Sequence, residues 1–458
     1  MAVDIVEGNK LPRVTVRSTP IQAHLSWTPL SAARVGERAG GDEPRSRRPA
    51  AALVVWAILA AVGAGPIAGQ IRPRFGPGLL AALAAGVVAV ALTPQLFRRL
   101  SWTRLLYVSF ALAAGWAILL AVSDGFDALG APLATRYEYL PDVPLVGSPV
   151  TFLQTFAERI GSFALHVRGH PPGMLLLLWA MDRAGLAGVG WEVLLVVAGG
   201  AAAVPAALLA LRHVAGDARA RAAAPFLILM PAAVWMATSA DAFFTGVSAW
   251  GVALVILASG RDDRRGDLLA AGGGALLGAS FFLSYGLVLV AIVPLMVAVA
   301  RRRFRPVLVA SLAVGAVFLA FGASGFWWPE GLLASLPHVR STSAHRSYAP
   351  FLLFNLGAFA IVLGPAIPVA LAGLRERGVW LLAGAGLLAV VAADVTGLSK
   401  GEVERIWLPF VPWVALAAGS FADNASRSRA DAERGQRLWL AVHVLAALAV
   451  QAVFRTPW

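Results

Sequence analysis

The sequence contains no cysteine, and only 14% of its 458 residues are charged. Without thiols the chain can form no disulfide, no thiolate metal site and no cysteine nucleophile, whatever compartment it occupies. The scarcity of charge excludes a water-soluble globule, because such a surface needs far more polar cover. Hydrophobic residues make up 59% of the chain, and the mean hydropathy is +0.73. We therefore expect a polytopic membrane protein.

A basic domain with exposed aromatic rings, on which nucleic-acid bases could stack, is also missing. The formal net charge of +13 comes instead from short arginine clusters that lie between hydrophobic runs. Clusters of this kind orient membrane helices, because basic loops are retained in the cytoplasm. We therefore expect the lipid bilayer to surround the chain, and we expect no nucleic-acid partner.

Apolar runs recur along the chain, each about as long as the ~20 residues that a helix needs to cross the hydrocarbon. They predict an all-α bundle of about 13 transmembrane helices, at 51–70, 78–97, 104–122, 191–211, 222–238, 241–258, 268–283, 285–300, 306–323, 351–371, 378–394, 405–421 and 438–453. Residues 51–458 would form one transmembrane domain. Residues 1–50 are polar and lack a signal-peptide core, so we expect a disordered cytoplasmic tail.

With the N-terminus inside, the arginine clusters between these helices all fall on the cytoplasmic side. The run 173–188 is short and is interrupted by Asp182 and Arg183, which favours a helix in the outer interface over a crossing. Four connections then face outward, and we expect the functional site on their side: 123–190 with its interfacial helices, the corner around Ser239–Asp241, 324–350 and 395–404. The excess of Arg over Lys and the abundance of Ala and Gly are typical of a GC-rich bacterial genome. The expected location is thus the bacterial inner membrane, with the site extracytoplasmic and facing the cell envelope.

The first outer loop opens with two candidate catalytic bases, Asp124 and Asp127. A carboxylate beside the membrane has a low-dielectric wall on one side, which suits it to proton abstraction. Both aspartates could instead be solvated residues that end the preceding helix. Further along, Tyr137 and Glu138 could bind a sugar by ring stacking and hydrogen bonds, although such tyrosines more often serve as interfacial anchors.

The segment His166–Met174 places a guanidinium and two imidazoles just before a Pro-Pro step. Arg168 and His170 could contact a phosphate, because Arg offers a planar fork of donors and His can donate at neutral pH. An ordinary transition from loop to helix is the alternative. Two histidines four positions apart without a third ligand are not a metal signature, so we predict no metal or other cofactor.

Charged residues gather again where the loop 395–404 enters a hydrophobic run. A charge at the hydrocarbon centre costs at least ~2.5–3.5 kcal/mol, so these groups should pair or bind a ligand. Lys400 and Arg405 are candidates for binding a phosphate, with Glu404 or Glu402 orienting Arg405. A self-contained ion-pair cap is the alternative. Helix capping is likewise the alternative for Asp241. The candidate substrate-binding residues in the remaining turns are Asp241, Tyr285, His338 and Arg340.

This order of elements resembles the GT-C superfamily of integral-membrane glycosyltransferases, which includes the protein O-mannosyltransferases and the bacterial aminoarabinose transferases. The resemblance covers roughly residues 104–421. It departs from the family pattern in two extra helices before the first outer loop, in His170 where a lysine is familiar, and in aspartates that are not adjacent. The elements that carry it are Asp124/Asp127, His170-Pro171-Pro172, Asp241, and Arg405 followed by Pro409 and Pro412.

The resemblance implies a polyprenyl-phosphate sugar donor and an inverting transfer to a hydroxyl of a glycan, lipid or protein acceptor. Asp124 or Asp127 would deprotonate that hydroxyl, and the cationic groups named above would stabilise the leaving phosphate. We accordingly expect Asp124, His170 and Arg405 to line one cavity open to lipid. A lipid or solute transporter or flippase is the alternative, but the runs carry little mid-span charge and no internal repeat.

Overall fold

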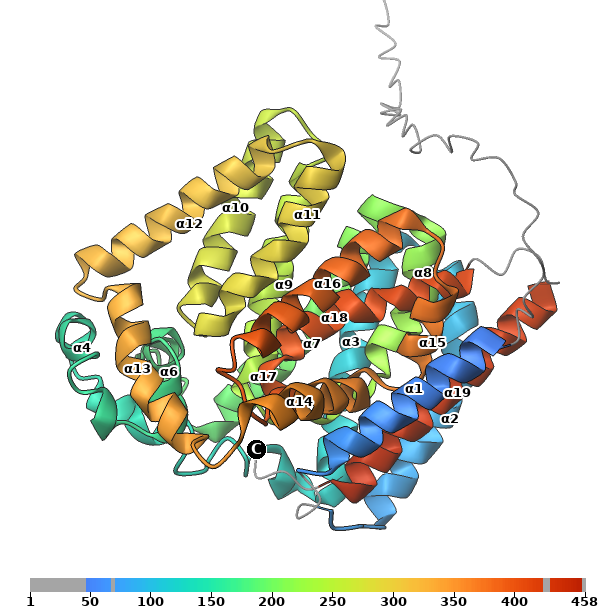
Figure 1. The fold of residues 1–458 in the computed structure, drawn as a ribbon, viewed down its shortest axis with the longest axis horizontal. Coiled ribbons are helices and arrows are strands. Elements are labelled where there is room, and N and C mark those ends of the chain that lie inside the picture. The colour runs from blue at the N-terminus through green and yellow to red at the C-terminus, as the bar shows by residue number, and fades with distance from the viewer. Residues whose placement is uncertain (1–46, 67–70, 423–428, 455–458) are drawn as a thin grey trace, which may run out of the picture. The chain divides into compact units, whose positions relative to one another are not determined.

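The computed structural model describes residues 47–66, 71–422 and 429–454. The predicted cytoplasmic tail falls almost wholly on residues 1–46, which lie outside the described residues. Apart from one isolated bridge between Ile71 and Phe454, the regular structure of the described ranges is helical, which confirms the all-α prediction (Figure 1).

Within these ranges, eight helical segments are long and apolar enough to cross a membrane. A ninth is obtained if α14 (Tyr348–Leu363) and α15 (Ala366–Gly373), which meet at an angle of 94°, are counted as one span. The eight are α2 (Pro77–Arg99), α3 (Trp102–Ala121), α7 (Val189–Ala215), α9 (Ala240–Ala258), α12 (Arg305–Ala323), α16 (Arg377–Val395), the run Val403–Ala422 and α19 (Arg429–Val453). The run Val403–Ala422 comprises α17 (Val403–Ile406), η8 (Leu408–Phe410), α18 (Val411–Ala415) and η9 (Leu416–Ala422).

The predicted count of about 13 crossings is not confirmed, because several apolar runs are shorter or broken. The run 351–371 bends at Gly364-Pro365, where Gly364 has a φ of 73° and proline has no N–H to donate. The run 222–238 stops at Ile228 and resumes as a short turn that begins at Pro231. The helices concerned are α1 (Arg47–Ala64), α8 (Asp217–Ile228) with η6 (Pro231–Val234), α10 (Arg264–Phe281), and η7 (Tyr285–Ala291) with α11 (Ile292–Arg301).

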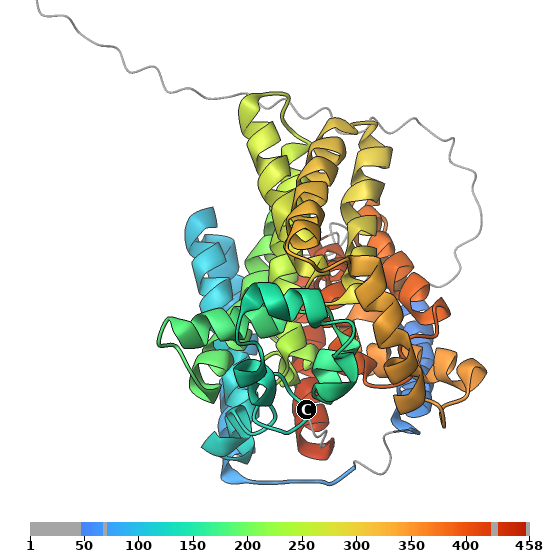
Figure 2. The ribbon, with the colours of Figure 1, turned by 90° about the vertical axis from the view of Figure 1, so that its left-hand side faces the viewer.

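The first outer loop folds into a string of short helices. Its last member, α6 (Gly173–Arg183), has 11 residues and is too short to cross, as predicted for 173–188. The others are η2 (Val122–Asp124), η3 (Phe126–Leu129), η4 (Leu140–Leu145), α4 (Pro149–Thr155), η5 (Ile160–Ser162) and α5 (Leu165–Gly169). The loop 324–350 contains α13 (Trp328–Thr342), which packs against α5 and η5 (Figures 1 and 2).

Small residues allow the membrane spans α7 and α9 to pack closely against each other. A Cβ on Gly246 of α9 would lie 2.1 Å from the carbonyl oxygen of Gly199 on α7, so the two backbones touch directly. This contact fixes α9, whose first turn carries Asp241. The run Val403–Ala422, whose first turn contains Arg405, is 83% buried inside the protein and therefore lies at its centre rather than at the lipid surface.

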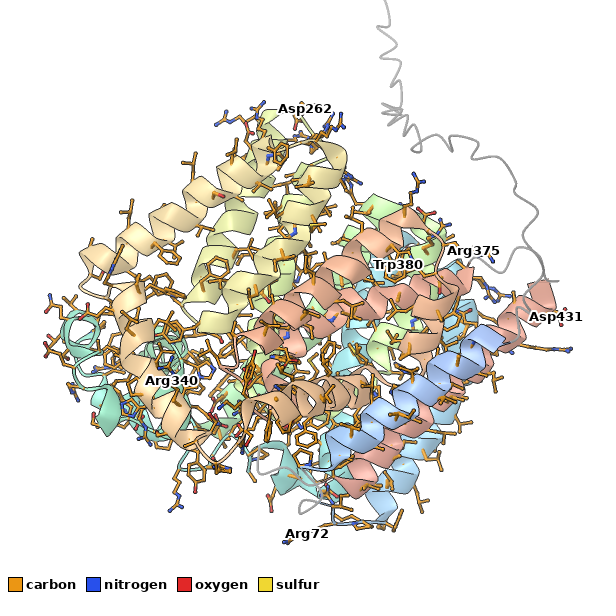
Figure 3. All side chains as sticks on the ribbon, in the orientation of Figure 1. Arg72, Asp262, Arg340, Arg375, Trp380 and Asp431 are labelled. Carbon is orange, nitrogen blue, oxygen red and sulfur yellow. The ribbon has the colours of Figure 1, made fainter. Side chains whose placement is uncertain are left out.

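The connecting loops separate into two groups at opposite ends of the spans. Figure 3 shows Asp262, Arg375 and Asp431 along the upper and right-hand margins, and Arg340 and Arg72 at the lower left and bottom. The first group belongs to loops that the arginine clusters predict on the cytoplasmic side, and Arg340 belongs to a predicted outer loop. The division into two faces follows the predicted topology, whereas the assignment of one face to the cytoplasm stays a prediction.

Candidate functional site

A cavity of about 340 Å³ lies where the four predicted outer connections meet. Polar side chains far apart in the sequence thus meet at one pocket, but of the three residues expected to line it, His170 is in the lining and Asp124 and Arg405 are not. A fifth segment, at the start of η7, also lines it. The polar lining residues include His166 and His170 from the first loop, Asp241 from the corner, Tyr285 from η7, His338 and Arg346 from 324–350, and Lys400 and Glu402 from 395–404.

The rest of the cavity wall is apolar. Aromatic rings and branched aliphatic side chains from five segments contribute to it, among them Phe244, Leu287, Trp328, Leu336 and Trp407. A pocket that combines such walls with a few convergent polar groups is suited to an amphiphilic ligand.

Arg405 is the centre of a buried ionic cluster beside this cavity. Its Nη1 donates to Oδ2 of Asp241 at 2.9 Å, and its Nη2 donates to Oε2 of Glu402 at 2.6 Å. Nη2 also donates to Nε2 of His166 at 2.8 Å. The Arg405 and Asp241 side chains are at most 5% exposed. Arg405 does not itself line the cavity, but it holds three side chains that do.

The cluster contains more carboxylates than cations. Because His166 accepts from Arg405 through Nε2, its proton lies on Nδ1, which donates to Oε1 of Glu138 at 2.9 Å. Ser239 also donates to Oδ2 of Asp241, at 2.9 Å. Three carboxylates thus surround one guanidinium, two directly and Glu138 through His166. The floor of the cavity is consequently rich in hydrogen-bond acceptors.

The backbone at Glu402 adopts a conformation that only a well-packed site sustains. Glu402 has a φ of 59° and follows Gly401, whose φ is 94°. A non-glycine residue in this region costs about 1–3 kcal/mol, and such residues concentrate at functional sites. A Cβ on Gly401 would come within 2.6 Å of Nη1 of Arg346, so the guanidinium can lie against this backbone only because residue 401 is glycine.

Arg346 and Lys400 form a cationic pair on the cavity wall. Lys400 Nζ donates to the carbonyl oxygen of Arg346 at 3.1 Å, and Arg346 Nη1 donates back to the carbonyl oxygen of Lys400. Neither side chain forms an ion pair with a carboxylate of the described residues. Thr342 and Ser343 lie nearby in the lining, and their hydroxyls donate to the carbonyl oxygens of His338 and Val339. The two cations allow this part of the wall to bind an anion.

His170 presents a different kind of group to the cavity. Its Nδ1 lies 2.8 Å from the carbonyl oxygen of His166, which can only accept, so Nδ1 is the donor and Nε2 carries the free lone pair. Burial lowers the pKa of His170, although the carboxylate of Asp241 and the bond to His166 partly oppose that shift. A neutral imidazole with Nε2 unprotonated accepts hydrogen bonds and does not donate to a phosphate from that atom. This differs from the predicted phosphate-binding role.

Asp124 does not line the cavity, so the expectation that it shares a cavity with His170 is wrong. Its carboxylate pairs with Arg74 and accepts from Nε2 of Gln451 at 3.0 Å. Arg74 in turn donates to the carbonyl oxygens of Gln451 and Phe454, at 3.2 and 3.0 Å, near the end of α19. Asp124 therefore supports a helix C-terminus. Asp127 is exposed and also lies outside the lining.

The other predicted site residues divide between the cavity and its surroundings. Tyr285, His338 and Lys400 line the cavity together with His170 and Asp241. Glu138 lies one step behind, through His166, and Glu404 is buried outside the lining. Tyr137 is 43% exposed, and its hydroxyl accepts from Arg136 at 2.7 Å. Arg340 is exposed on α13, and Arg168 does not reach the lining.

Glu402 and Arg346 also line the cavity. The sequence offers Glu402 only as an alternative to Glu404 for orienting Arg405, and Arg346 only as one member of the Arg/His group of loop 324–350. The Gly401-Glu402 step is a signal that could have favoured Glu402, because a glycine before an acidic residue can mark an unusual turn. No group of three or more His, Cys, Asp or Glu side chains that could hold a metal ion occurs in the part of the chain that the structure describes. A metal-independent site stays a prediction.

No protein-family model matches this sequence, and no curated protein matches it. Among solved structures, the chain is similar to crystal structures of ArnT from Cupriavidus metallidurans. The apo form shows 16% identity and a TM-score of 0.41 over 71% of this chain and 62% of that one. The form bound to undecaprenyl phosphate shows 16% identity and a TM-score of 0.40 over 70% and 62%.

The chain is also similar to the Archaeoglobus fulgidus oligosaccharyltransferase in complex with zinc and sulfate. That match has 13% identity and a TM-score of 0.44 over 76% of this chain and 53% of that one. The chain thus spans between 53% and 62% of the length of these structures. The function is argued below from the cavity itself.

Proposed function

We propose that this protein is a GT-C-type membrane glycosyltransferase that moves a sugar from a polyprenyl-phosphate donor to an acceptor hydroxyl on the extracytoplasmic side of the bacterial inner membrane. One observation carries the proposal: a single, largely apolar cavity contains two cations that form no ion pair with a carboxylate of the described residues, and two carboxylates that can accept hydrogen bonds. The cations are Arg346 and Lys400, and the carboxylates are those of Asp241 and Glu402.

The two polar regions match the two ends of such a donor. A lipid-linked phosphate needs cationic donors beside an apolar wall, and Arg346 and Lys400 lie in a wall that includes Trp328 and Leu336. A sugar carries hydroxyl donors, and the carboxylates of Asp241 and Glu402 can accept from them. Arg405 holds both carboxylates in place, so their orientation is set before the sugar arrives.

The chemistry follows from this arrangement. The acceptor oxygen attacks the anomeric carbon from the face opposite the phosphate, and the bond from that carbon to the phosphate oxygen breaks, which inverts the configuration. The electron pair leaves with the phosphate, where Arg346 and Lys400 stabilise the developing charge. The acceptor proton passes to a base in the cavity. The acceptor is a glycan, lipid or protein hydroxyl.

The proposal is tested with purified protein in lipid nanodiscs, a panel of radiolabelled polyprenyl-phosphate sugars and a membrane extract as the source of acceptor. We expect label to move from the donor to acceptor. Replacing Arg346 or Lys400 by Met should weaken binding of polyprenyl phosphate by roughly ten- to hundredfold, because a charge-assisted hydrogen bond contributes about 1.5–3 kcal/mol. The matched control is Arg340→Met, which removes an exposed cation from the same loop. Movement of the intact donor across proteoliposomes, without cleavage, would overturn the proposal in favour of transport.

A further inference from the structure

His170 is held in the one tautomer that leaves a lone pair for the cavity. Nδ1 donates to the carbonyl oxygen of His166 at 2.8 Å, which leaves Nε2 unprotonated. Nε2 forms no hydrogen bond with any of the described residues, and His170 lines the cavity. A hydroxyl that enters the cavity therefore finds an imidazole acceptor that no protein group occupies.

The backbone and neighbouring rings prevent His170 from turning away. Its own N–H bonds to the carbonyl oxygen of Val167 at 3.3 Å, and Pro171-Pro172 follows at once. Gly173 then donates to the carbonyl oxygen of Phe282 at 2.9 Å, and a Cβ at Gly173 would lie 2.3 Å from that oxygen. The ring of Tyr139 meets the imidazole edge-on at 6.2 Å between centroids, and Phe244 lies at 6.0 Å. A fixed ring is what a proton acceptor in the reaction needs.

The carboxylates of the lining are already engaged. Asp241 and Glu402 each use an oxygen in an ion pair with Arg405, and protonation of either would weaken that pair. Asp124 and Asp127, the bases expected from the sequence, do not line the cavity. Among the described residues, His170 and His338 are the imidazoles of the lining that remain without an ion pair, and of the two it is His170 whose tautomer is fixed by a hydrogen bond.

We propose that His170 is the general base of the transfer reaction, in place of a carboxylate of the first outer loop. The proposal rests on the function proposed above. Nε2 accepts the proton of the acceptor hydroxyl as that oxygen bonds to the anomeric carbon, and the electron pair of the breaking bond leaves on the polyprenyl phosphate. The imidazolium formed is stabilised by the carboxylate of Asp241 and later releases its proton to solvent or to the departing phosphate.

The charged and titratable groups that act on His170 agree with this role. Burial lowers the pKa of His170, and the charge of Arg405 adds to this, whereas the carboxylate of Asp241 and the hydrogen bond to the carbonyl oxygen of His166 oppose it. The lowered pKa favours the neutral imidazole. Burial, together with the nearby carboxylates, raises the pKa of Tyr139 well above its ordinary value. The phenol therefore stays protonated and does not compete as a base.

The test compares His170→Gln with the wild type in the donor assay. We expect kcat to fall by about 10²–10⁴-fold, with binding of undecaprenyl phosphate unchanged. In the wild type, kcat/KM should decline in acid as His170 protonates, and this acid limb should be absent from the residual activity of the variant. Asp124→Asn is the matched control and should keep both the rate and the limb.

Two results would overturn the assignment. One is turnover by His170→Gln at a rate close to that of the wild type, or with the acid limb retained. The other is a nitrogen NMR spectrum of histidine-labelled protein, assigned by the loss of a signal in His170→Gln, that shows Nε2 protonated at pH 7.5. If the wild type cleaves none of the donors, the proposed function is wrong, and the assignment of His170 as the base is wrong with it. If the wild type cleaves a donor and His170→Gln does so at a similar rate, only the assignment of the base is wrong.

Discussion

Arg405 donates from Nη1 to Oδ2 of Asp241 across 2.9 Å, although the two residues are 164 positions apart in the chain. The bond joins the first turn of α9 to the start of the run Val403–Ala422, and both side chains are almost completely buried. Glu402 and His166 bind the same guanidinium. Three segments of the cavity lining are thereby held together by one side chain.

Replacing Arg405 by Met should destabilise the protein strongly, by about 3–5 kcal/mol, because it leaves the buried carboxylate of Asp241 without its counter-charge and removes the partner of the partly buried Glu402. Asp241→Asn should cost less, since Arg405 keeps Glu402 and His166 as partners. Thermal unfolding in detergent, followed by tryptophan fluorescence, measures both changes. Arg340→Met serves as the control. Equal midpoints for Arg405→Met and Arg340→Met would contradict the central role of Arg405.

Replacing Asp124 by Asn should affect folding rather than catalysis. The pair with Arg74 is only partly buried, so its loss should cost at most about 1 kcal/mol. The turnover of the folded fraction should not change, because Asp124 lies outside the cavity lining. Asp124→Asn and Asp127→Asn are compared by unfolding midpoint and by the donor assay, each rate normalised to folded protein. A loss of kcat with an unchanged midpoint would restore Asp124 as the base.

Replacing Gly246 by Ala should separate α7 from α9. The new methyl would lie 2.1 Å from the carbonyl oxygen of Gly199, and overpacking of this kind typically costs about 1–3 kcal/mol. Gly315→Ala is the matched control, since a Cβ there meets no atom within 4 Å. Because alanine favours a helix over glycine, that control should leave the unfolding midpoint unchanged or slightly raised. Equal shifts for both variants would show that the α7–α9 contact is not tight.

Asp263 should make the loop before α10 sensitive to acid. Its hydrogen bond with Arg261, and the bond it accepts from the N–H of Gly266, lower its pKa to about 2. A carboxylate with a depressed pKa stabilises the fold above its ordinary pKa, and that stabilisation is lost as the pH falls towards 2. Asp263→Asn should therefore lower the unfolding midpoint at pH 6 and converge with the wild type in acid. A constant gap between Asp263→Asn and the wild type over this range would contradict the assignment.

Hydropathy predicted where apolar helices lie but not which of them continue across a proline. Pro94 and Pro205 lie inside α2 and α7, which remain long spans, whereas the run 351–371 bends at Gly364-Pro365. The bend lies where Gly364 adopts a φ of 73°, outside the helical region, whereas the helices around Pro94 and Pro205 stay continuous. A single sequence does not contain that information, and the count of crossings was overestimated for this reason.

In the candidate site, too, the local sequence indicates which residues are unusual, but not which distant residues they contact. His170, Asp241 and Lys400 could be predicted because unusual polar residues at the ends of apolar runs need a partner or a ligand. Asp124 has the same local pattern, yet its partner is Arg74, 50 positions earlier, and no pattern in the sequence connects the two.

The sequence by itself determined that this chain is a helical membrane protein and that its reactive side chains belong to a few connections on one face. The reason is that hydrocarbon tolerates neither charge nor unpaired backbone, so composition separates the apolar runs from the polar connections between them. Only the tertiary structure decided which of those side chains share a cavity, which are neutralised by Arg405, and which nitrogen of His170 is free. These depend on contacts between residues far apart in the chain, and such contacts arise from packing rather than from local pattern.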